Sequence, residues 1–400
     1  MKNKYKLFSL LSLLPVGIVP LASVSCSSSY KDNDNYIKNV NFTVPSPWLK
    51  GFKKENVQFF KNIEKRFNEL KKDNKKLKNK PDIVIDFKLN NSRQSIFNDV
   101  LTASSAVSFP SSVFLNLNKN AEQKNIDAVE PILLTTTYAP IYDNKDLFYV
   151  SDRATLESNA VKMTKRFNEL PYKDWTDSNR LYDKKVYQYF YEPNQHVKFQ
   201  RGAVYITGDE STLKAIKQAW KNKDWNAFRN FGIVKYKDKN SSSKFLYPEF
   251  LFKHHFNQEN NKFIGFNEDQ SSHNNKYLNY PDKESARNMY QPNYEKFHIF
   301  LGEENEFAYH HNSKNKQYFS KVNERVEILT LTDPYLFNVV VVDKNMNAEQ
   351  MKLLKQSIKE AQDDYGKLIG ITGYLGLEDL KTNHSTLSDY IKEYYKKASH

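Results

Sequence analysis

Apolar residues recur along the chain with two periods, one typical of strands and one typical of helices. Residues 40–44 alternate apolar and polar side chains and predict a strand, and Pro45 and Pro47 end it before a helix begins. The helix has a single apolar face and charged residues elsewhere, so we expect it to pack on a sheet. That face carries Phe60, Ile63, Phe67 and Leu70.

The same alternation of strand and helix continues downstream. Residues 83–87 predict a buried strand, residues 96–101 a helix, and residues 113–115 a further strand. Strands that alternate with helices in this way are typical of a parallel sheet with helices on its faces.

A second α/β unit begins after Thr135. Residues 203–206 predict a strand, and Asp209 is the expected N-cap of a helix. Residues 339–342 predict a late strand, and Asn347 with Gln350 resembles a capping box at the start of the helix that follows. About 365 residues exceed what one core usually holds, so we expect two lobes. The predicted first lobe comprises residues 36–135 and 336–400, and the second residues 138–330.

The N-terminus has the order of a signal peptide. Three lysines, at positions 2, 4 and 6, precede an apolar stretch, and Cys26, the only cysteine, follows it. A lone cysteine at this place favours lipidation, since no disulfide can form within the chain. We therefore expect a signal peptide at 1–25 and a lipidated, flexible tether at 26–35, holding the protein at the outer face of the cell membrane. Ser23 stands where a lipobox usually has Leu, so an ordinary secretory signal with a chance cysteine is the alternative.

Charge and motifs limit the function classes. The chain has 60 basic and 47 acidic residues, a net charge of +13, but the lysines are spread along the sequence among acidic residues. This pattern does not favour a specific nucleic-acid site. The sequence also lacks GxxxxGK[ST], GxGxxG and GxSxG, and we expect no enzymatic activity and no catalytic cofactor.

Seven segments, in a fixed order along the chain, resemble one family. The resemblance is to the mycoplasmal extracytoplasmic thiamine-binding lipoproteins, which are similar to phosphonate-binding receptors. It implies a two-lobed type II periplasmic-binding-protein fold, in which each lobe is an open sheet flanked by helices and the ligand lies between the lobes. It also implies an ABC importer receptor that binds thiamine pyrophosphate or thiamine and delivers it to a permease served by a separate ATPase subunit. The segments are residues 174–177, 223–233, 241–245, 266–271, 296–299, 306–309 and 364–368.

The serine segment, Ser241, Ser242 and Ser243, is the candidate phosphate site. A helix that starts at the serines would present unpaired N–H groups and a positive dipole end, with Lys244 as an added charge. From the residues alone, a plain serine N-cap with nothing bound is the alternative. The resemblance favours phosphate binding, because the family has a phosphate-binding serine motif at this place.

Aromatic and amide side chains are candidates for the rest of the ligand. Trp48 follows the first strand, where open α/β sheets bind ligands, and Tyr309 is expected to face it from the other lobe. Asn91 and Ser92 follow the second strand and are further candidates, with a plain turn as the alternative. Trp225 is expected in the core because it shares a helix face with Phe228.

The ligand and the role have alternatives. Helix-terminus phosphate binding suits other phosphorylated or phosphonate solutes equally well. A surface adhesin or nuclease is a different class that would use the basic surface. We predict no protein metal site, because the adjacent histidine pairs do not converge on one ion. A divalent cation that bridges the pyrophosphate through Asp or Glu stays open.

Overall fold

The computed structural model describes residues 35–45, 53–90, 93–112, 129–141, 152–273, 276–279, 285–363 and 374–379. Residues 36–400 form one compact unit. The expected signal peptide, the lipidation site Cys26 and the strand at 113–115 lie outside the described residues. Among the described residues, no helix is long and apolar enough to cross a membrane.

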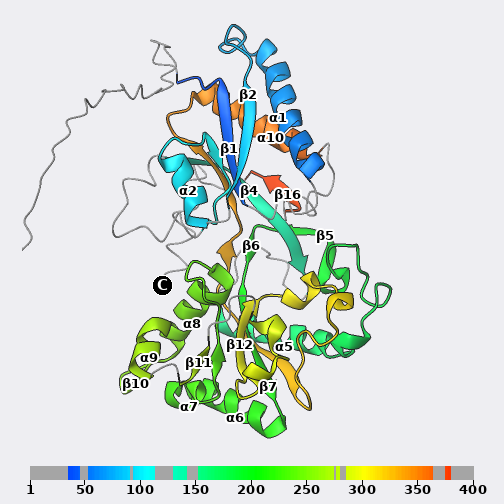
Figure 1. Ribbon diagram of the computed structural model, residues 1–400, viewed down its shortest axis with the longest axis vertical. Helices are drawn as coiled ribbons and strands as arrows, with labels where there is room; N and C mark the ends of the chain where they lie inside the picture. The colour runs from blue at the N-terminus through cyan, green and yellow to red at the C-terminus, as the bar shows by residue number, and fades with distance from the viewer. Residues whose placement is uncertain are drawn as a thin grey trace, which may run out of the picture. The chain divides into compact units, whose positions relative to one another are not determined.

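The first sheet has seven strands, ordered β16-β4-β15-β3-β1-β2, with β5 paired to β4 (Figure 1). β1, β2 and β3 are parallel, as expected, but β15 runs antiparallel to both β3 and β4. The expectation of a purely parallel sheet is therefore wrong, because a strand from late in the chain inserts between two earlier ones. The strands are β1 Asn39–Pro45, β2 Val84–Asn90, β3 Val107–Ser108, β4 Val129–Pro140, β5 Tyr191–Val197, β15 Val339–Asp343 and β16 Gly376–Glu378.

Helices cover both faces of this sheet. The helices α1 (Lys53–Asp73) and α10 (Ala348–Asp363) pack on one face, and α2 (Arg93–Leu101) packs on the other (Figure 1). Strand β15 shows the alternation that this requires. Val340 and Val342 belong to the core beneath α1 and α10, whereas Val339 and Val341 belong to the core beneath α2.

Capping at the start of α10 differs in part from the expectation. Asn347 Oδ1 accepts a hydrogen bond from the Gln350 backbone at 3.0 Å, as a capping box requires. The Gln350 side chain does not return to Asn347. Its amide instead accepts from Ile37 N at 2.8 Å and donates to Ile37 O at 2.6 Å, which ties α10 to the first residues of the folded unit.

The second sheet has five strands, ordered β11-β8-β12-β7-β13, with β7 antiparallel to both neighbours.

Two predictions for this region are confirmed. Asp209 caps α6 by accepting from Thr212 N at 2.7 Å, and the buried Trp225 packs with Phe228 in the core. α6, α7 and α8 cover one face, and α5 covers the other. The bounds are β7 Gly202–Gly208, β8 Ile233–Val234, β11 Leu278–Asn279, β12 Ile299–Glu303, β13 Arg325–Leu331, α5 Arg153–Phe167, α6 Glu210–Lys221, α7 Trp225–Arg229, α8 Tyr247–His255 and α9 Phe266–His273.

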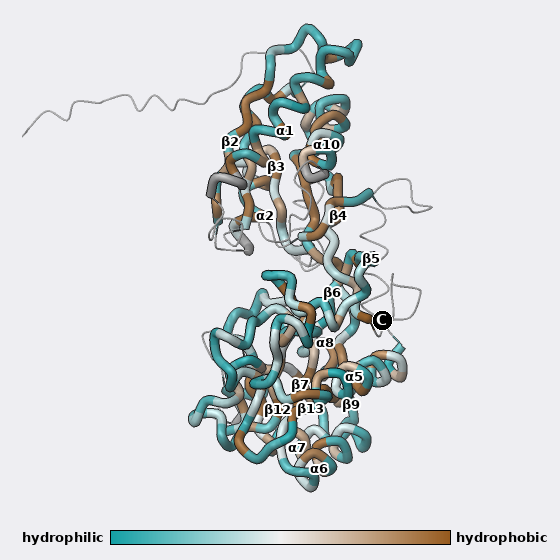
Figure 2. The backbone as a smooth tube through the Cα atoms, turned by 90° about the vertical axis from the view of Figure 1, so that its right-hand side faces the viewer, coloured by the Kyte–Doolittle hydropathy of each residue, from teal (hydrophilic) through white to brown (hydrophobic). Residues whose placement is uncertain are grey.

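The chain passes between the two sheets along β4 and returns between β13 and β15. The N-terminal half of β4 pairs with β15, and its C-terminal end pairs with β5. Apolar residues concentrate on the strands and on the helix faces against them (Figure 2). The lobe boundaries at 135, 138, 330 and 336 stay a prediction. The remaining short elements are β6 Phe199–Gln200, β9 Asn257–Gln258, β10 Asn261–Lys262, β14 Tyr335–Leu336, and the 3-10 turns η2 Tyr172–Asp174, η3 Gln188–Phe190, η5 Ala286–Asn288, η6 Pro292–Tyr294, η7 Glu306–Tyr309 and η8 Asn312–Lys314.

Candidate functional site

The serine segment starts a helix, as the sequence predicted. Ser241 precedes a π-helical turn, η4 (Ser242–Leu246), that continues directly into α8. The Ser241 carbonyl accepts from Phe245 N at 3.1 Å and from Leu246 N at 2.9 Å, while its side chain makes no capping hydrogen bond. A helix start leaves its first N–H groups without intrahelical partners and carries the positive end of the dipole. Because π-helical turns are frequent at functional sites, this geometry suits an anion site.

All three serines are buried, and two of them have side-chain partners in other elements. The Ser243 hydroxyl donates to Glu303 Oε1 at 3.3 Å, at the end of β12. The Ser242 and Ser111 hydroxyl oxygens are 3.5 Å apart. Ser111 follows the carboxyl end of β3, which is where open α/β sheets bind ligands. The serine helix of one sheet therefore meets the carboxyl edge of the other.

Lys244 forms a buried ion pair. Its Nζ lies 2.8 Å from Glu306 Oε1 and 3.7 Å from Glu303 Oε1, and the side chains of Lys244 and Glu306 are only 7% and 2% exposed. These two carboxylates offset the ammonium charge in this structure. A direct contact between Lys244 and a ligand stays a prediction.

Tyr309 ends the same turn that holds Glu306. Its ring centroid lies 6.1 Å from that of Tyr191. Burial raises the pKa of the Tyr309 hydroxyl, and hydrogen bonds with Tyr191 and Thr137 partly offset the rise, so the phenol is neutral at physiological pH. Thr137 lies on β4, so Tyr309 contacts the strand that passes between the sheets. Tyr309 therefore lies in the same turn as Glu306, the carboxylate that pairs with Lys244 of the serine segment.

A small cavity of about 20 Å³ adjoins Tyr309, and Asn305 lines it. The Asn305 side chain is buried, its backbone has a φ of 54°, and among the described residues neither amide atom has a hydrogen-bond partner. A buried amide without partners costs about 1–3 kcal/mol for each unsatisfied group. Asn305 is therefore a polar group suited to bonding a ligand or a water molecule at the edge of the site.

Sequence patterns did not identify the charged residues that surround the serine segment and Tyr309. Arg201 Nη1 binds Glu304 Oε1 at 2.9 Å, and both side chains are almost fully buried. Glu303 ends the apolar strand β12, and Glu304 and Glu306 follow it. Acidic residues at the end of an apolar strand are the signal that would have identified them. Their cationic partners are distant in sequence and show no local pattern.

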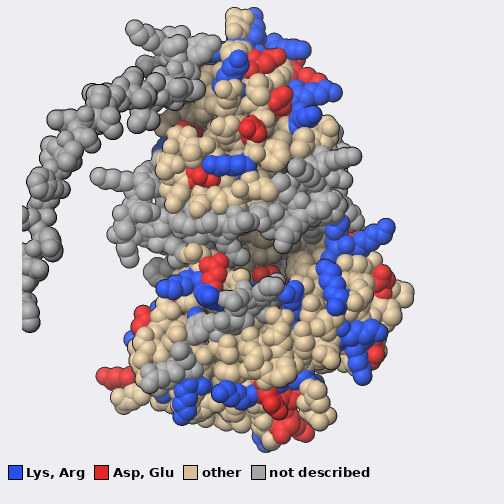
Figure 3. All heavy atoms as spheres, viewed as in Figure 1, with Lys and Arg blue, Asp and Glu red and all other residues tan. Residues whose placement is uncertain are grey.

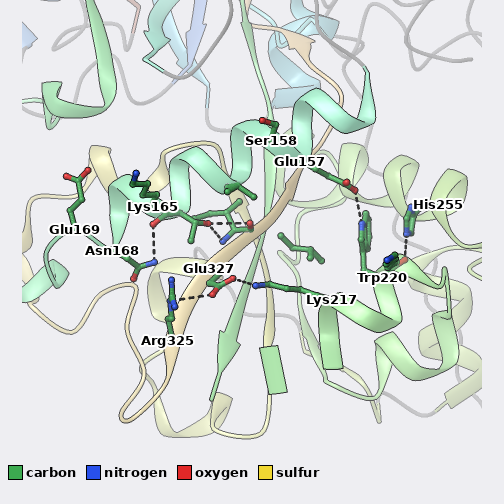
Figure 4. Close-up of a pocket in the computed structure, with 15 residues that line it drawn as sticks. Glu157, Ser158, Lys165, Asn168, Glu169, Lys217, Trp220, His255, Arg325 and Glu327 are labelled. Atoms are coloured by element: carbon green, nitrogen blue, oxygen red, sulfur yellow. Dashed lines mark hydrogen bonds and ion pairs between the residues drawn. The ribbon is translucent and has the colours of Figure 1, made fainter. Parts of the chain in front are cut away.

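A larger groove, of about 1170 Å³, lies between α5, α6 and β13 (Figure 4). Its polar groups mostly bind each other. Glu157 accepts from Trp220 Nε1 at 3.0 Å, and Glu327 pairs with Lys217 at 2.5 Å. The Trp220 ring stacks on His255 with centroids 3.6 Å apart, so that ring face is already covered. We therefore do not assign the solute to this groove.

The other predicted ligand residues cannot be placed with the serines. Trp48, Asn91 and Ser92 lie outside the described residues. Within the described ranges, no group of three or more His, Cys, Asp or Glu side chains is arranged to hold a metal ion.

Comparisons with known proteins agree with this geometry. Residues 57–391 match the family model described as "Extracytoplasmic thiamine-binding lipoprotein". The high affinity transport system protein p37 of Mesomycoplasma hyorhinis is 36% identical over 402 residues, which cover 96% of this chain and 93% of that protein. The p37 protein of Mycoplasma pneumoniae is 30% identical over 304 residues, covering 70% of this chain and 76% of the relative.

A solved structure has the same fold. It is that of the M. hyorhinis protein Mh-p37, proposed there to be a thiamine pyrophosphate transporter. It matches with a TM-score of 0.77 and 32% sequence identity, and the match covers 92% of this chain and all of that one (100%). The α/β fold of periplasmic-binding-protein type that the resemblance implied is confirmed.

Proposed function

Because the chain belongs to the extracytoplasmic thiamine-binding lipoprotein family, we propose that it binds thiamine pyrophosphate at the helix start formed by Ser241, Ser242 and Ser243. The family consists of solute-binding transport proteins, not enzymes. Delivery of the solute to an ABC permease with its ATPase subunit, and attachment to the membrane through a lipid on Cys26, complete the proposal.

One observation carries the phosphate end of this proposal. A buried serine-rich helix start lies against Ser111, at the carboxyl edge of the first sheet. Hydroxyl and backbone N–H donors with a positive dipole end bind phosphate oxygens without a dedicated cation. Lys244 is consistent with that design, since it lies beside the site but pairs with Glu306.

The ring end of the ligand is proposed to lie on aromatic side chains. Tyr309 presents a neutral phenol beside the glutamates, and Trp48 is the proposed partner from the other lobe. A thiazolium cation is attracted to aromatic faces and to nearby carboxylates such as Glu303, whose side chain is 36% exposed. In this proposal the serines and Tyr309 belong to the predicted second lobe, and Trp48 contributes to the ring end from the predicted first lobe.

Carboxylates beside a pyrophosphate raise the question of a bridging cation. Glu303 is a partly exposed carboxylate that accepts from the Ser243 hydroxyl, and its oxygens suit Mg²⁺. Glu303 alone offers few oxygen ligands. The pyrophosphate oxygens would therefore supply most of the ligands of a cation bound here. Binding of the pyrophosphate with such a cation is the second form of this proposal.

Isothermal titration calorimetry tests the solute. The chain from Ser27 onward is titrated with thiamine pyrophosphate, thiamine, pyrophosphate and methylphosphonate, each with Mg²⁺ and with EDTA. We expect thiamine pyrophosphate to bind most tightly and pyrophosphate to compete with it. Tighter binding of methylphosphonate would favour the alternative, a receptor for another phosphorylated or phosphonate solute. An EDTA-sensitive affinity would favour the cation-bridged form.

A further inference from the structure

The end of the first sheet at which β1 begins is rich in lysine. The last residues of α1 and the turn that follows, residues 71–82, hold six lysines and two aspartates, a net charge of +4. Figure 3 shows Lys and Arg side chains gathered at this end of the molecule, with acidic ones beside them. We name its exposed lysines the basic edge. They are Lys38, Lys72, Lys75, Lys76 and Lys78.

The acidic groups at this end are largely paired already. The buried Lys71 donates to Lys80 O at 2.5 Å and pairs with Asp82 at 2.9 Å, and its hydrogen bond holds the pKa of Asp82 below the usual value. Glu349, at the start of α10, pairs with Lys76 at 3.2 Å. Among the described residues, the other four lysines of the basic edge have no ion pair. Their charge is directed to solvent.

The basic edge surrounds the point where the chain enters the folded unit. The Tyr36 hydroxyl donates to Pro81 O at 2.7 Å, in the lysine-rich turn, and Val84 N donates to Lys38 O at 2.9 Å. Gln350 holds Ile37 through both amide atoms. The first residues of the folded unit are therefore held beside the lysine-rich turn and the start of α10.

From this arrangement we propose that the basic edge docks on an anionic lipid surface and turns the solute site away from the bilayer. This inference rests on the proposed lipidation of Cys26, which would bring the basic edge close to the membrane. The nine residues between Cys26 and Tyr36 span at most about 35 Å, so a lipid on Cys26 keeps the edge near the membrane. Exposed lysines are attracted to anionic lipid within about 10 Å of its surface, which makes this edge the part of the fold that meets it.

The orientation follows from the direction of the parallel strands. Lys38 precedes β1, whereas Ser111 and the serine helix lie beyond the carboxyl end of β3, which is parallel to β1. A strand of seven residues separates its ends by roughly 20 Å. A receptor docked by its basic edge presents the solute site to the medium.

Vesicle sedimentation tests the docking without the lipid anchor. Residues 36–400 form their own compact unit, so the chain from Ser27 onward keeps the fold. The test variant combines Lys38→Gln, Lys72→Gln, Lys75→Gln and Lys78→Gln. The matched control makes the same charge change on exposed lysines of the second-sheet region, Lys162→Gln, Lys173→Gln, Lys214→Gln and Lys262→Gln.

We expect the unmodified chain to bind phosphatidylcholine vesicles containing about 30 mol% phosphatidylglycerol, and not pure phosphatidylcholine. The basic-edge variant should lose binding by at least about fifty-fold, and the control by less than about threefold, since each lysine near the surface contributes roughly a fivefold factor. Equal losses in both variants, or equal binding to both vesicle types, would overturn the proposal. Edge-dependent binding to duplex DNA without vesicle binding would overturn it in favour of a nucleic acid.

Single-cysteine labelling tests the orientation. The chain from Ser27 onward has no cysteine, so Asn79→Cys in the lysine-rich turn and Lys239→Cys beside the serine segment each give one site for an environment-sensitive fluorophore. Anionic vesicles should change the emission at position 79 and leave position 239 unchanged, and the reverse would overturn the orientation. Calorimetry with thiamine pyrophosphate on the basic-edge variant separates this inference from the proposed function, because solute affinity should be unaffected.

Discussion

Gly202 and Ser243 approach so closely that a β-carbon on residue 202 would lie 2.4 Å from the Ser243 carbonyl oxygen. Gly202 begins β7, and its N–H donates to the Thr332 hydroxyl at 2.8 Å. The strand and the serine turn are thus in direct backbone contact. Glycine is required here for close approach rather than for an unusual φ.

Gly202→Ala should displace the serine turn. The added methyl group would meet the Ser243 carbonyl oxygen and the Thr332 methyl carbon, the latter at 2.9 Å. Neither neighbour is the end of a long, flexible side chain that could move aside. Overpacking of this kind costs about 1–3 kcal/mol, and we expect affinity for thiamine pyrophosphate to fall roughly tenfold or more. Chemical denaturation and calorimetry measure the two effects. Unchanged affinity in a destabilised variant would show that the turn does not bind the solute.

The Lys244–Glu306 pair makes a prediction about stability. Lys244→Met leaves a carboxylate that is 2% exposed without its cation. Removing one partner of a buried pair costs about 3–5 kcal/mol. Adding Glu306→Gln should recover much of the loss, because glutamine keeps an acceptor for the Glu303 N–H, now bonded at 2.9 Å.

An ion pair with an exposed lysine provides the comparison for Lys244. Lys253 lies 3.6 Å from Glu249, and the Lys253 side chain is 40% exposed. Lys253→Met should cost less than about 1 kcal/mol. Urea denaturation of the three variants tests the difference, and equal costs for Lys244→Met and Lys253→Met would contradict the role of burial.

How far the sequence predicts this protein depends on how local each feature is. The apolar face of α1 and the alternation in β1 are visible within a few residues, and both elements form where expected. The insertion of β15 beside β3 is a contact between residues more than 200 positions apart, and no local pattern encodes its direction. The structure has a strand, β3, at Val107–Ser108 that the pattern did not predict, and the strand expected at 113–115 lies outside the described residues.

The candidate site also combines features that are visible locally in the sequence with features that depend on contacts between distant residues. Three consecutive serines before an aromatic segment predict a helix start locally, and a helical turn begins there. Lys244 and Glu306 are 62 positions apart, so their pairing depends on the packing of η4 against the end of β12. The unpartnered amide of Asn305 likewise depends on tertiary burial, which the sequence does not display.

The buried Lys235 predicts an unusual dependence of stability on pH. Burial lowers the pKa of Lys235 to about 7, partly offset by Glu249, and its Nζ lies 4.1 Å from the Phe245 ring centroid. The unfolded chain has the ordinary lysine pKa of about 10.4, so between about pH 7 and pH 9.5 it binds more protons at this residue than the folded chain does. The free energy of unfolding should therefore rise with pH over that window. Burial raises the pKa of Tyr138 and other tyrosines, whose opposing effect begins at higher pH.

Lys235→Met should remove that rise and stabilise the protein at pH 7. The variant replaces a buried ammonium with an apolar side chain of similar length, and we expect a gain on the order of 1–4 kcal/mol. Lys237→Met, at an exposed position two residues on, serves as the control. Urea denaturation from pH 7 to about pH 9.5 is the measurement. A flat or falling profile in the unmodified chain would contradict the prediction.

The two ends of the proposed ligand should respond to different substitutions. Replacing Ser241, Ser242 and Ser243 together by alanine removes hydroxyl donors but keeps the backbone N–H groups of the helix start. Hydrogen bonds to charged groups contribute about 1.5–3 kcal/mol each, so losing two should weaken thiamine pyrophosphate binding by about a hundredfold or more, with thiamine unaffected. Trp48→Ala removes the proposed stacking surface and should weaken thiamine and thiamine pyrophosphate by similar factors. Titration calorimetry of both ligands against both variants distinguishes the ends. If the triple-serine variant loses both ligands equally, or keeps both at the original affinity, the serines only cap a helix and the phosphate assignment fails.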